Sequence, residues 1–277
     1  MQSLINEKKK FDQLILKSTN KSNSHIKPNT VYYDDDYYNQ LIVELKNRQL
    51  YKSFEKRELQ ETSIGSGKIK MCSAASSSRL CFINFVNDKQ IYFECSLTTG
   101  TKGKAQLDAV KDNIYYECKC HEIFDNHDTD KNHLRLAYKK NLQKYFGIIY
   151  QEKDENYCKL SLSDFGIENK ESIYSLHFDM KQLLCHLFGI ARNGGGTLQY
   201  IFFTPKKEFI ENNEFCKNIY KELENEINQI WHCEKITTMI NNFKIKLPHP
   251  QMIDVSLIED VVLKNRPCHK FCVNGRG

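Results

Sequence analysis

Asp108, Glu117 and Lys119 lie within a short stretch of the chain and have residue types suited to metal-assisted hydrolysis. Carboxylates within about 4–6 Å of each other raise each other's pKa unless a cation lies between them. Two carboxylates on rigid strands suit Mg²⁺, which keeps several waters and takes further ligands from a substrate phosphate. Lys119 follows Glu117 by two residues, so its ammonium can hold the attacking water and offset negative charge in the transition state. This combination is best suited to phosphodiester hydrolysis.

The hydrophobic pattern around these residues predicts one mixed sheet flanked by helices, which is an α/β fold. Three β-rich segments separated by turns indicate a meander of hairpins, and they span 90–96, 104–110 and 113–120. Apolar periodicity, serine caps and a terminating glycine run predict three further elements. One is a helix before the meander, and the others are a helix and a buried strand after it. These three elements are expected at 74–87, 178–191 and 197–203.

Strand alternation should bring the charged residues together. Alternation places Gln106 and Asp108 on one face of the second strand, and Glu117 and Lys119 on one face of the third. A hairpin between these strands would set Asp108 beside Glu117, and Glu94 takes the corresponding place on the first strand. Three adjacent strands would then direct carboxylates to one place.

The triplet Glu117-Cys118-Lys119 means little alone. With 35 acidic and 40 basic residues in 277, about five acid-x-base triplets arise by chance. The aspartate across a tight turn and the matched strand faces add specificity. The alternative is an exposed sheet face with cross-strand ion pairs, which is common in proteins.

The run KAQLDAVKDNIYYECKCHE (104–122) resembles the D…(D/E)-x-K core of the PD-(D/E)XK, or restriction-endonuclease-like, nucleases. The order helix, three strands, helix, strand is similar to the core of that family and would cover 74–205. The segments SSSRLCFINF (76–85) and KQLLCHLFGI (181–190) add a resemblance to a group of bacterial predicted restriction endonucleases.

The resemblance implies that Asp108 and Glu117 are the metal ligands and Lys119 is the catalytic lysine. It implies Mg²⁺ as the cofactor, with Mn²⁺ able to substitute, and double-stranded DNA as the substrate. Leu107 stands where the family name has proline, at a position that varies. The helix 74–87 lacks the extra acid that many members carry, so either Glu94 substitutes or the site uses one metal.

Several polar residues are candidates for contact with DNA. Gln182 and His186 lie four apart on one helix face, and the resemblance suggests that they make a polar contact with the site or with DNA. Two satisfied polar groups in a core helix are an equal alternative. Lys104 shares the strand face of Asp108. A basic amphipathic helix over 131–145 contains no acid and suits a phosphate backbone, or else is simply a solvated surface. Its candidate contacts are Lys131, Arg135 and Lys139.

Composition excludes several classes. The 277 residues include 11 cysteines without paired zinc-type spacing, and the net charge is +5. No apolar run is long enough to span a bilayer, and no signal peptide pattern begins the chain, so we expect a cytoplasmic protein with reduced thiols. No phosphate-binding P-loop motif is present, so no nucleotide cofactor is expected.

We therefore expect a helical N-terminal region (1–67), a nuclease core (68–205) and a helical C-terminal region (206–277). The C-terminal region should contain one long helix over 206–232 and another over 253–263. The expected activity is Mg²⁺-dependent endonucleolytic cleavage of DNA in restriction of phage, by a homodimer if both strands are cut. The alternatives are a non-catalytic DNA- or partner-binding module on the same fold, or a repair or toxin nuclease acting on structured DNA or RNA.

Overall fold

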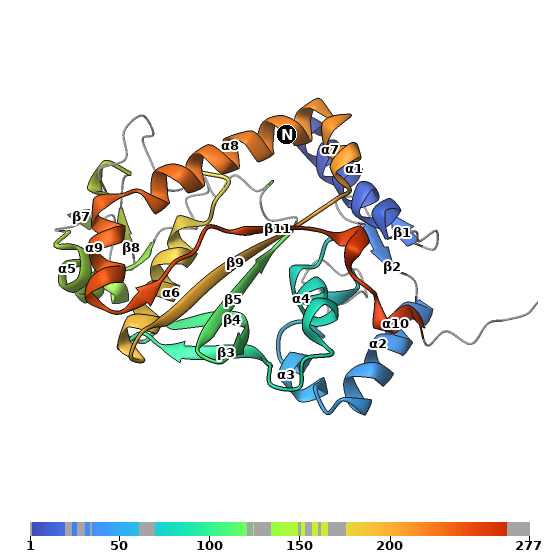
Figure 1. Cartoon of the computed structure of the whole chain (residues 1–277), viewed down its shortest axis with the longest axis horizontal. Coiled ribbons are helices and arrows are strands. Elements are labelled where there is room, and N and C mark those ends of the chain that lie inside the picture. The colour runs from blue at the N-terminus through green and yellow to red at the C-terminus, as the bar shows by residue number, and fades with distance from the viewer. Residues whose placement is uncertain are drawn as a thin grey trace, which may run out of the picture.

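The computed structural model describes residues 2–19, 24–26, 31–33, 35–60, 70–120, 124, 134–148, 151–152, 157–159, 162–165 and 176–264. Its α-helices in chain order are α1 (Gln2–Ser18), α2 (Asp35–Asn47), α3 (Tyr51–Glu55), α4 (Ser77–Phe85), α5 (Lys139–Phe146), α6 (Met180–Arg192), α7 (Lys207–Glu211), α8 (Glu214–Trp231), α9 (Glu234–Asn242) and α10 (Val261–Lys264). Figure 1 shows these helices arranged around one central sheet.

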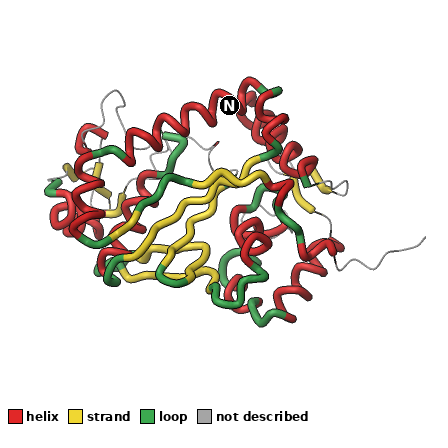
Figure 2. Tube along the Cα trace, in the orientation of Figure 1, coloured by secondary structure: helices red, strands yellow, loops and turns green. Residues whose placement is uncertain are grey.

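The central sheet is mixed and has six strands (Figure 2). Its strands are β3 (Tyr92–Thr98), β4 (Lys104–Lys111), β5 (Ile114–Lys119), β9 (Gly196–Thr204), β10 (Ile245–Lys246) and β11 (Gln251–Asp254). β3, β4 and β5 form an antiparallel meander, whereas β9 runs parallel to β5 and carries β10 and β11 on its other edge. The expected α/β class, with a mixed sheet flanked by helices, is therefore confirmed.

Short strands form two smaller sheets. In one, β1 (Ser24–Ile26) pairs with β2 (Val31–Tyr33). In the other, β8 (Tyr157–Lys159) lies between β6 (Leu134–Arg135) and β7 (Gln151–Glu152). All of these pairs are antiparallel.

Local sequence explains the elements that border the meander. Asp112 and Asn113 both have left-handed backbone, with φ of 47° and 62°, so they close β4 and β5 with a two-residue turn, within the tight turn expected at 111–113. Ser76 caps α4 by accepting a hydrogen bond from the Arg79 N–H at 3.2 Å. Asp179 caps α6 by accepting one from the Gln182 N–H at 2.9 Å.

The two helices of the core cover opposite faces of β5. On one face, the Tyr116 ring packs against Phe85 of α4, with ring centroids 4.7 Å apart. On the other face, the Lys119 ammonium donates a hydrogen bond to Gln182 of α6 at 2.6 Å. α6 lies close to the sheet because it presents Gly189, where an added Cβ would fall 2.7 Å from the Ala105 Cβ.

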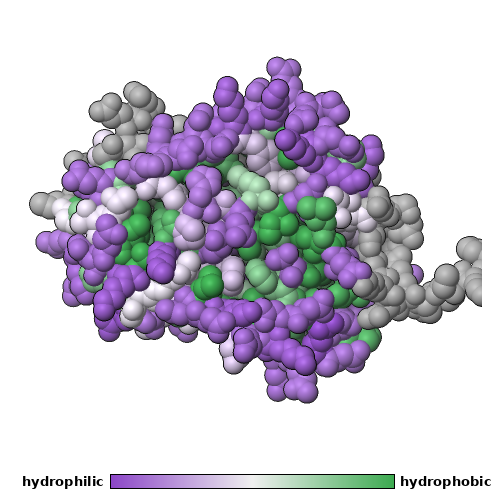
Figure 3. Space-filling view, viewed as in Figure 1, coloured by the Kyte–Doolittle hydropathy of each residue, from purple (hydrophilic) through white to green (hydrophobic). Residues whose placement is uncertain are grey.

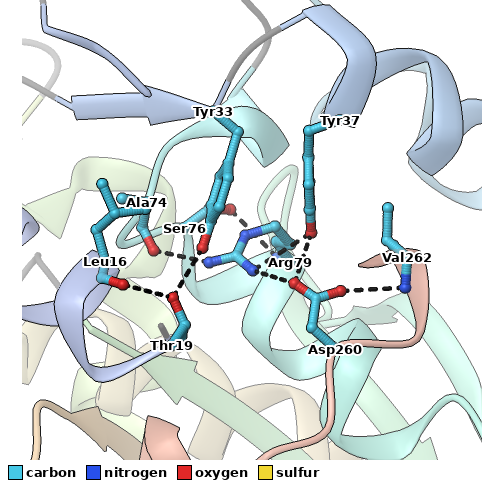
Figure 4. A network of polar contacts seen from close by, with 9 residues as sticks. All are labelled: Leu16, Thr19, Tyr33, Tyr37, Ala74, Ser76, Arg79, Asp260 and Val262. Atoms are coloured by element: carbon cyan, nitrogen blue, oxygen red, sulfur yellow. Dashed lines mark hydrogen bonds and ion pairs between the residues drawn. The ribbon is translucent and has the colours of Figure 1, made fainter. Parts of the chain in front are cut away.

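A buried arginine joins the N-terminal helices, α4 and the C-terminal segment (Figure 4). Arg79 of α4 is 0% exposed and lies 3.4 Å from Asp260, which precedes α10. Its guanidinium also donates to the Ala74 carbonyl at 2.7 Å and lies over the rings of Tyr33 and Tyr37. The regions that precede and follow the core in the chain are thus connected to it through the Arg79 guanidinium.

The structure corrects some of the helices expected outside the core. The helix expected over 206–232 is two helices, α7 and α8, because Asn213 leaves the helical conformation and caps α8 through the Cys216 N–H. The helix expected over 253–263 is wrong: its first residues belong to β11, which pairs with β9, and Val255–Leu257 form a 3-10 turn before α10. Of the basic helix over 131–145, the first residues lie outside the described residues, and its helical part is α5 after a 3-10 turn at Leu136–Tyr138.

Hydrophilic residues cover most of the rim in the view of Figure 3, and hydrophobic residues show mainly in the middle of this face. Among the large hydrophobic side chains that are described, Leu257 is the most exposed, at 81%. Within the described part of the chain, no helix has the length and apolar character needed to cross a membrane.

Candidate active site

Glu117 and Lys119 of β5 form a closed group of contacts with Gln182 of α6. The Lys119 Nζ lies 2.7 Å from the Glu117 Oε1 and donates to the Gln182 Oε1 at 2.6 Å. The Gln182 Nε2 in turn donates to the Glu117 Oε1 at 2.7 Å. The Glu117 side chain is 4% exposed and that of Lys119 is 12% exposed, so the ion pair is largely shielded from water.

Asp108 lies where β4 separates from β5. The pairing of these strands runs from Lys111 with Ile114 to Ala109 with Tyr116, and one further step in this register would pair Asp108 with Glu117. Instead, the Asp108 Oδ2 accepts a hydrogen bond from the Cys118 N–H at 2.6 Å. The Asp108 carboxylate therefore takes the place of a main-chain acceptor where the pairing of β4 with β5 ends, next to Glu117.

Glu94 brings a third carboxylate to the same region from β3. Burial raises the pKa of Glu94 to about 8, and the charges of Asp108, Glu58 and Glu117 contribute in the same direction. Arg57 is the cation that opposes this shift. The carboxylates of Asp108 and Glu117 are thus near enough to Glu94 to affect its ionisation.

The backbone of Glu94 has a left-handed conformation, with φ of 54°, which is rare for a residue within a strand. Before it, Phe93 packs against Phe82 of α4. After it, Leu97 lies against α6, where an added Cβ at Gly189 would fall 3.1 Å from the Leu97 Cβ. The β3–β4 hairpin therefore packs against α4 before Glu94 and against α6 after it. This change occurs beside Asp108.

This change of face modifies the expected alternation on β4. Ala109 shares its face with Tyr116, which packs on α4, whereas Ala105 lies against α6. The apolar residues of β4 do alternate in burial, as the sequence predicts, but they contact different helices at the two ends of the strand. The Gln106 side chain is consequently directed to its neighbour Ser96, whose hydroxyl donates to the Gln106 Oε1 at 2.6 Å.

His186 of α6 lies beneath Glu117 in the interior, with 1% of its surface exposed. Burial, together with the charge of Lys119, lowers the pKa of His186 to about 3, so the imidazole is neutral. Its Nε2 lies 2.7 Å from the Gln106 carbonyl and its Nδ1 lies 3.3 Å from the Tyr200 hydroxyl. Because a carbonyl only accepts, the Nε2–H donates to it and the Nδ1 accepts from Tyr200.

The structure places the other candidate residues in different settings. Lys104 and Lys139 are exposed, at the starts of β4 and α5. Lys131 and the side chain of Arg135 lie outside the described residues. Gln182 and His186 match the alternative of hydrogen-bonded residues on the inner face of a core helix. Gln182 also makes a polar contact with the site, as the resemblance suggests, but the spacing on α6 does not identify Lys119 and Glu117 as its partners.

Among the residues that the structure describes, no group of three or more His, Cys, Asp or Glu side chains is arranged to hold a metal ion. The donor set nevertheless suits a hard cation in its chemistry, since carboxylates are the ligands that Mg²⁺ takes in proteins. Burial is the main cause of the raised pKa of Glu94, and the neighbouring negative charges, which a cation would offset, add to it. Asp108 and Glu117 are the residues that fit such an ion.

Comparisons of the chain with protein-family models, with curated proteins and with solved structures gave no match.

Proposed function

We propose that this protein is a Mg²⁺-dependent endonuclease that hydrolyses phosphodiester bonds in double-stranded DNA. The observation that carries the proposal is the convergence of Asp108, Glu117 and Lys119 from two paired strands. Supporting it is the order α4, β3, β4, β5, α6, β9, with β9 parallel to β5, which is the order expected of a restriction-endonuclease-like core. Restriction of foreign DNA is the role that this interpretation favours.

In the proposed reaction, Asp108 and Glu117 would hold Mg²⁺, which would polarise the scissile phosphate and lower the pKa of a bound water. Lys119 would position the attacking water and offset negative charge on the phosphate oxygens. Gln182 would orient both Lys119 and Glu117, because it contacts each of them in the absence of substrate. His186 would keep α6 fixed to β4 through the Gln106 carbonyl.

Cleavage of unmethylated plasmid and phage DNA in Mg²⁺ tests this proposal. Wild-type protein should produce fragments, and Lys119→Ala should reduce the rate by at least about 100-fold, as expected when a group that stabilises the transition state is removed. Lys111→Ala is the matched control, because Lys111 lies on the neighbouring strand and pairs with Asp88 at 2.5 Å. This control should cleave as the wild type does.

The pattern of products distinguishes the types of nuclease. Discrete fragments would indicate a site-specific restriction enzyme, whereas a smear that Lys119→Ala abolishes would indicate a repair or toxin nuclease. Equal activity of wild type and Lys119→Ala would contradict the proposed site. Light scattering with and without DNA tests the proposed homodimer, which a monomer under both conditions would exclude.

A second candidate function is a non-catalytic DNA-binding module on the same fold. It is favoured by the contacts of Glu117, whose Oε1 is held by Lys119 and Gln182 and whose Oε2 lies 3.5 Å from the His186 Nε2. A metal ion at Glu117 would have to share or replace these contacts. Calorimetric titration with Mg²⁺ separates the candidates, because the enzyme should bind the ion and lose it in Asp108→Asn. DNA binding without either response would favour the module.

A further inference from the structure

An excess of positive over negative charge lies near one end of the central sheet. Three segments meet there: 96–107 around the β3–β4 turn, 134–147 with α5, and 180–196 with α6. Together they contain eight basic residues and no acidic residue, whereas the rest of the chain contains the other 32 basic and all 35 acidic residues. The net charge of +5 therefore arises from these segments alone, and the remainder of the chain is slightly negative.

Hydrogen bonds from two helices fix the turn between β3 and β4. Asn141 of α5 donates to the Thr99 carbonyl at 3.0 Å, and Asn193 at the end of α6 donates to the Thr98 carbonyl at 3.2 Å. The Thr99 hydroxyl closes the turn by donating to the Gly103 carbonyl at 2.7 Å. Since a fixed turn loses little conformational freedom when it binds a ligand, the backbone that carries its lysines is preorganised for binding.

Close packing also brings basic residues of different segments together. An added Cβ at Gly100 would lie 2.9 Å from the Cδ of Arg192, so the side chain of Arg192 crosses the turn. An added Cβ at Gly103 would lie 2.0 Å from the Tyr138 hydroxyl, directly before α5. Lys102 and Lys104 flank Gly103. We call the exposed residues Lys102, Lys104, Lys140 and Arg192 the basic platform.

The basic platform and the candidate active site lie on the same strand. Lys104 begins β4, and Asp108 follows four residues later, about 13 Å away at roughly 3.3 Å per residue. This distance corresponds to about four base-pair steps of duplex DNA at roughly 3.4 Å each. A single duplex is therefore long enough to reach from one place to the other.

We propose that the basic platform binds the phosphate backbone of the same double-stranded DNA that enters the candidate active site. This inference rests on the proposed function and identifies the surface that holds the substrate beside the scissile phosphate. Phosphate contacts of this kind position a duplex without reading its sequence. The platform would thus contribute affinity and orientation, while base recognition lies elsewhere.

The surroundings of the platform favour a nucleic acid over a membrane. A surface that binds lipid carries apolar side chains able to enter the bilayer beside its basic residues. Among the described residues, the large exposed hydrophobic side chains are Tyr38, Val43, Tyr92, Met252 and Leu257, and none of them lies in the three basic segments. A polar, basic and rigid surface instead matches a polyanion that remains in water.

Fluorescence anisotropy with a DNA duplex of about 20 base pairs, in EDTA and across about 50–200 mM NaCl, measures the platform without cleavage. The test variant combines Lys102→Gln, Lys104→Gln and Arg192→Gln. The matched control combines Lys207→Gln, Lys217→Gln and Lys221→Gln on α7 and α8, which cross the top of Figure 1, away from the β3–β4 turn. Both variants remove three surface charges, so only the position of the lost charge differs.

The platform variant should bind at least about 10-fold more weakly at low salt, and its slope of log K against log salt should be shallower by about 2–3. The control should differ little from the wild type. Equal effects in both variants would overturn the proposal, as would platform-dependent binding to anionic lipid vesicles but not to DNA. An RNA duplex bound more tightly than the DNA duplex would overturn the choice of DNA.

This measurement is independent of catalysis. If the platform variant binds normally while wild-type protein cleaves DNA in Mg²⁺, the platform is wrong and the proposed nuclease stands. If binding depends on the platform but no cleavage occurs in Mg²⁺, the platform stands and the nuclease proposal fails.

Discussion

Two buried charged clusters in this molecule are built on opposite principles. Around Arg79, one cation faces one carboxylate, Asp260, and its remaining contacts are neutral groups (Figure 4). Around Glu117, three carboxylates converge with Lys119, and one of them, Glu94, has its pKa raised to about 8. The Arg79 cluster is balanced in charge and connects elements, whereas the gathering of carboxylates around Glu117 is the feature on which the proposed metal site rests.

The largest effect on stability is expected from Arg79→Met. This substitution leaves Asp260 buried without its cation, which should lower the free energy of unfolding by about 3–5 kcal/mol. Urea denaturation measures this change. Lys10→Met is the control, because Lys10 pairs with Glu7 at the surface and such pairs contribute about 0–1 kcal/mol. A loss below that of the control would show that Arg79 is not the cation that balances this cluster.

Asp108→Asn should have the opposite profile. Its side-chain oxygen can still accept from the Cys118 N–H, and a negative charge is removed from a crowded group, so stability should be unchanged or higher. Cleavage in Mg²⁺ should fall by at least about 100-fold, because a metal ligand is lost. Paired measurements of unfolding and cleavage test this separation. Loss of stability by more than about 1 kcal/mol would place Asp108 among the structural residues.

Glu94→Gln should stabilise the protein in a pH-dependent way. Because the folded state raises the pKa of Glu94 from 4.5 to about 8, its contribution to stability is complete below pH 4.5 and is lost as the pH rises through 8. In EDTA the variant should therefore exceed the wild type by about 1–2 kcal/mol at pH 8 and by much less at pH 5. Urea denaturation at both values measures the difference, and an equal difference at both would contradict the assignment.

The smallest effect is expected from Lys111→Gln, which removes a partly exposed ion pair with Asp88. Such pairs contribute about 0–1 kcal/mol, so the midpoint of unfolding should shift only slightly, and less in high salt. Thermal unfolding with and without added NaCl measures this. A large, salt-independent loss of stability would mean that exposed and buried ion pairs contribute equally. It would contradict the special role given to the buried pair of Arg79 and Asp260.

The sequence predicts the parts of the fold that depend on neighbouring residues. The turn at Asp112 and Asn113, the cap at Ser76 and the alternation on β5 all follow from local preferences. The segment 253–263 was mispredicted because β11 forms by pairing with β9, about 50 residues away in the chain, and such pairing overrides local propensity.

The site shows the same division. The adjacency of Asp108 and Glu117 could be predicted because both lie on one hairpin. The left-handed backbone at Glu94 could not, since glutamate rarely adopts it and only the surrounding packing imposes it. The contact of Lys119 with Gln182 joins residues 63 positions apart, and it depends on how α6 crosses the sheet.

The parallel pairing of β5 with β9 also sets the order in which the site can be assembled. The β4–β5 hairpin is local and can form within about 1–10 microseconds. Gln182 emerges from the ribosome 63 residues after Lys119, a delay of roughly 3–12 seconds at about 5–20 residues per second. During synthesis, Glu117 and Lys119 are therefore made well before α6 can cover them, and β9 can pair with β5 only after α6 has been made.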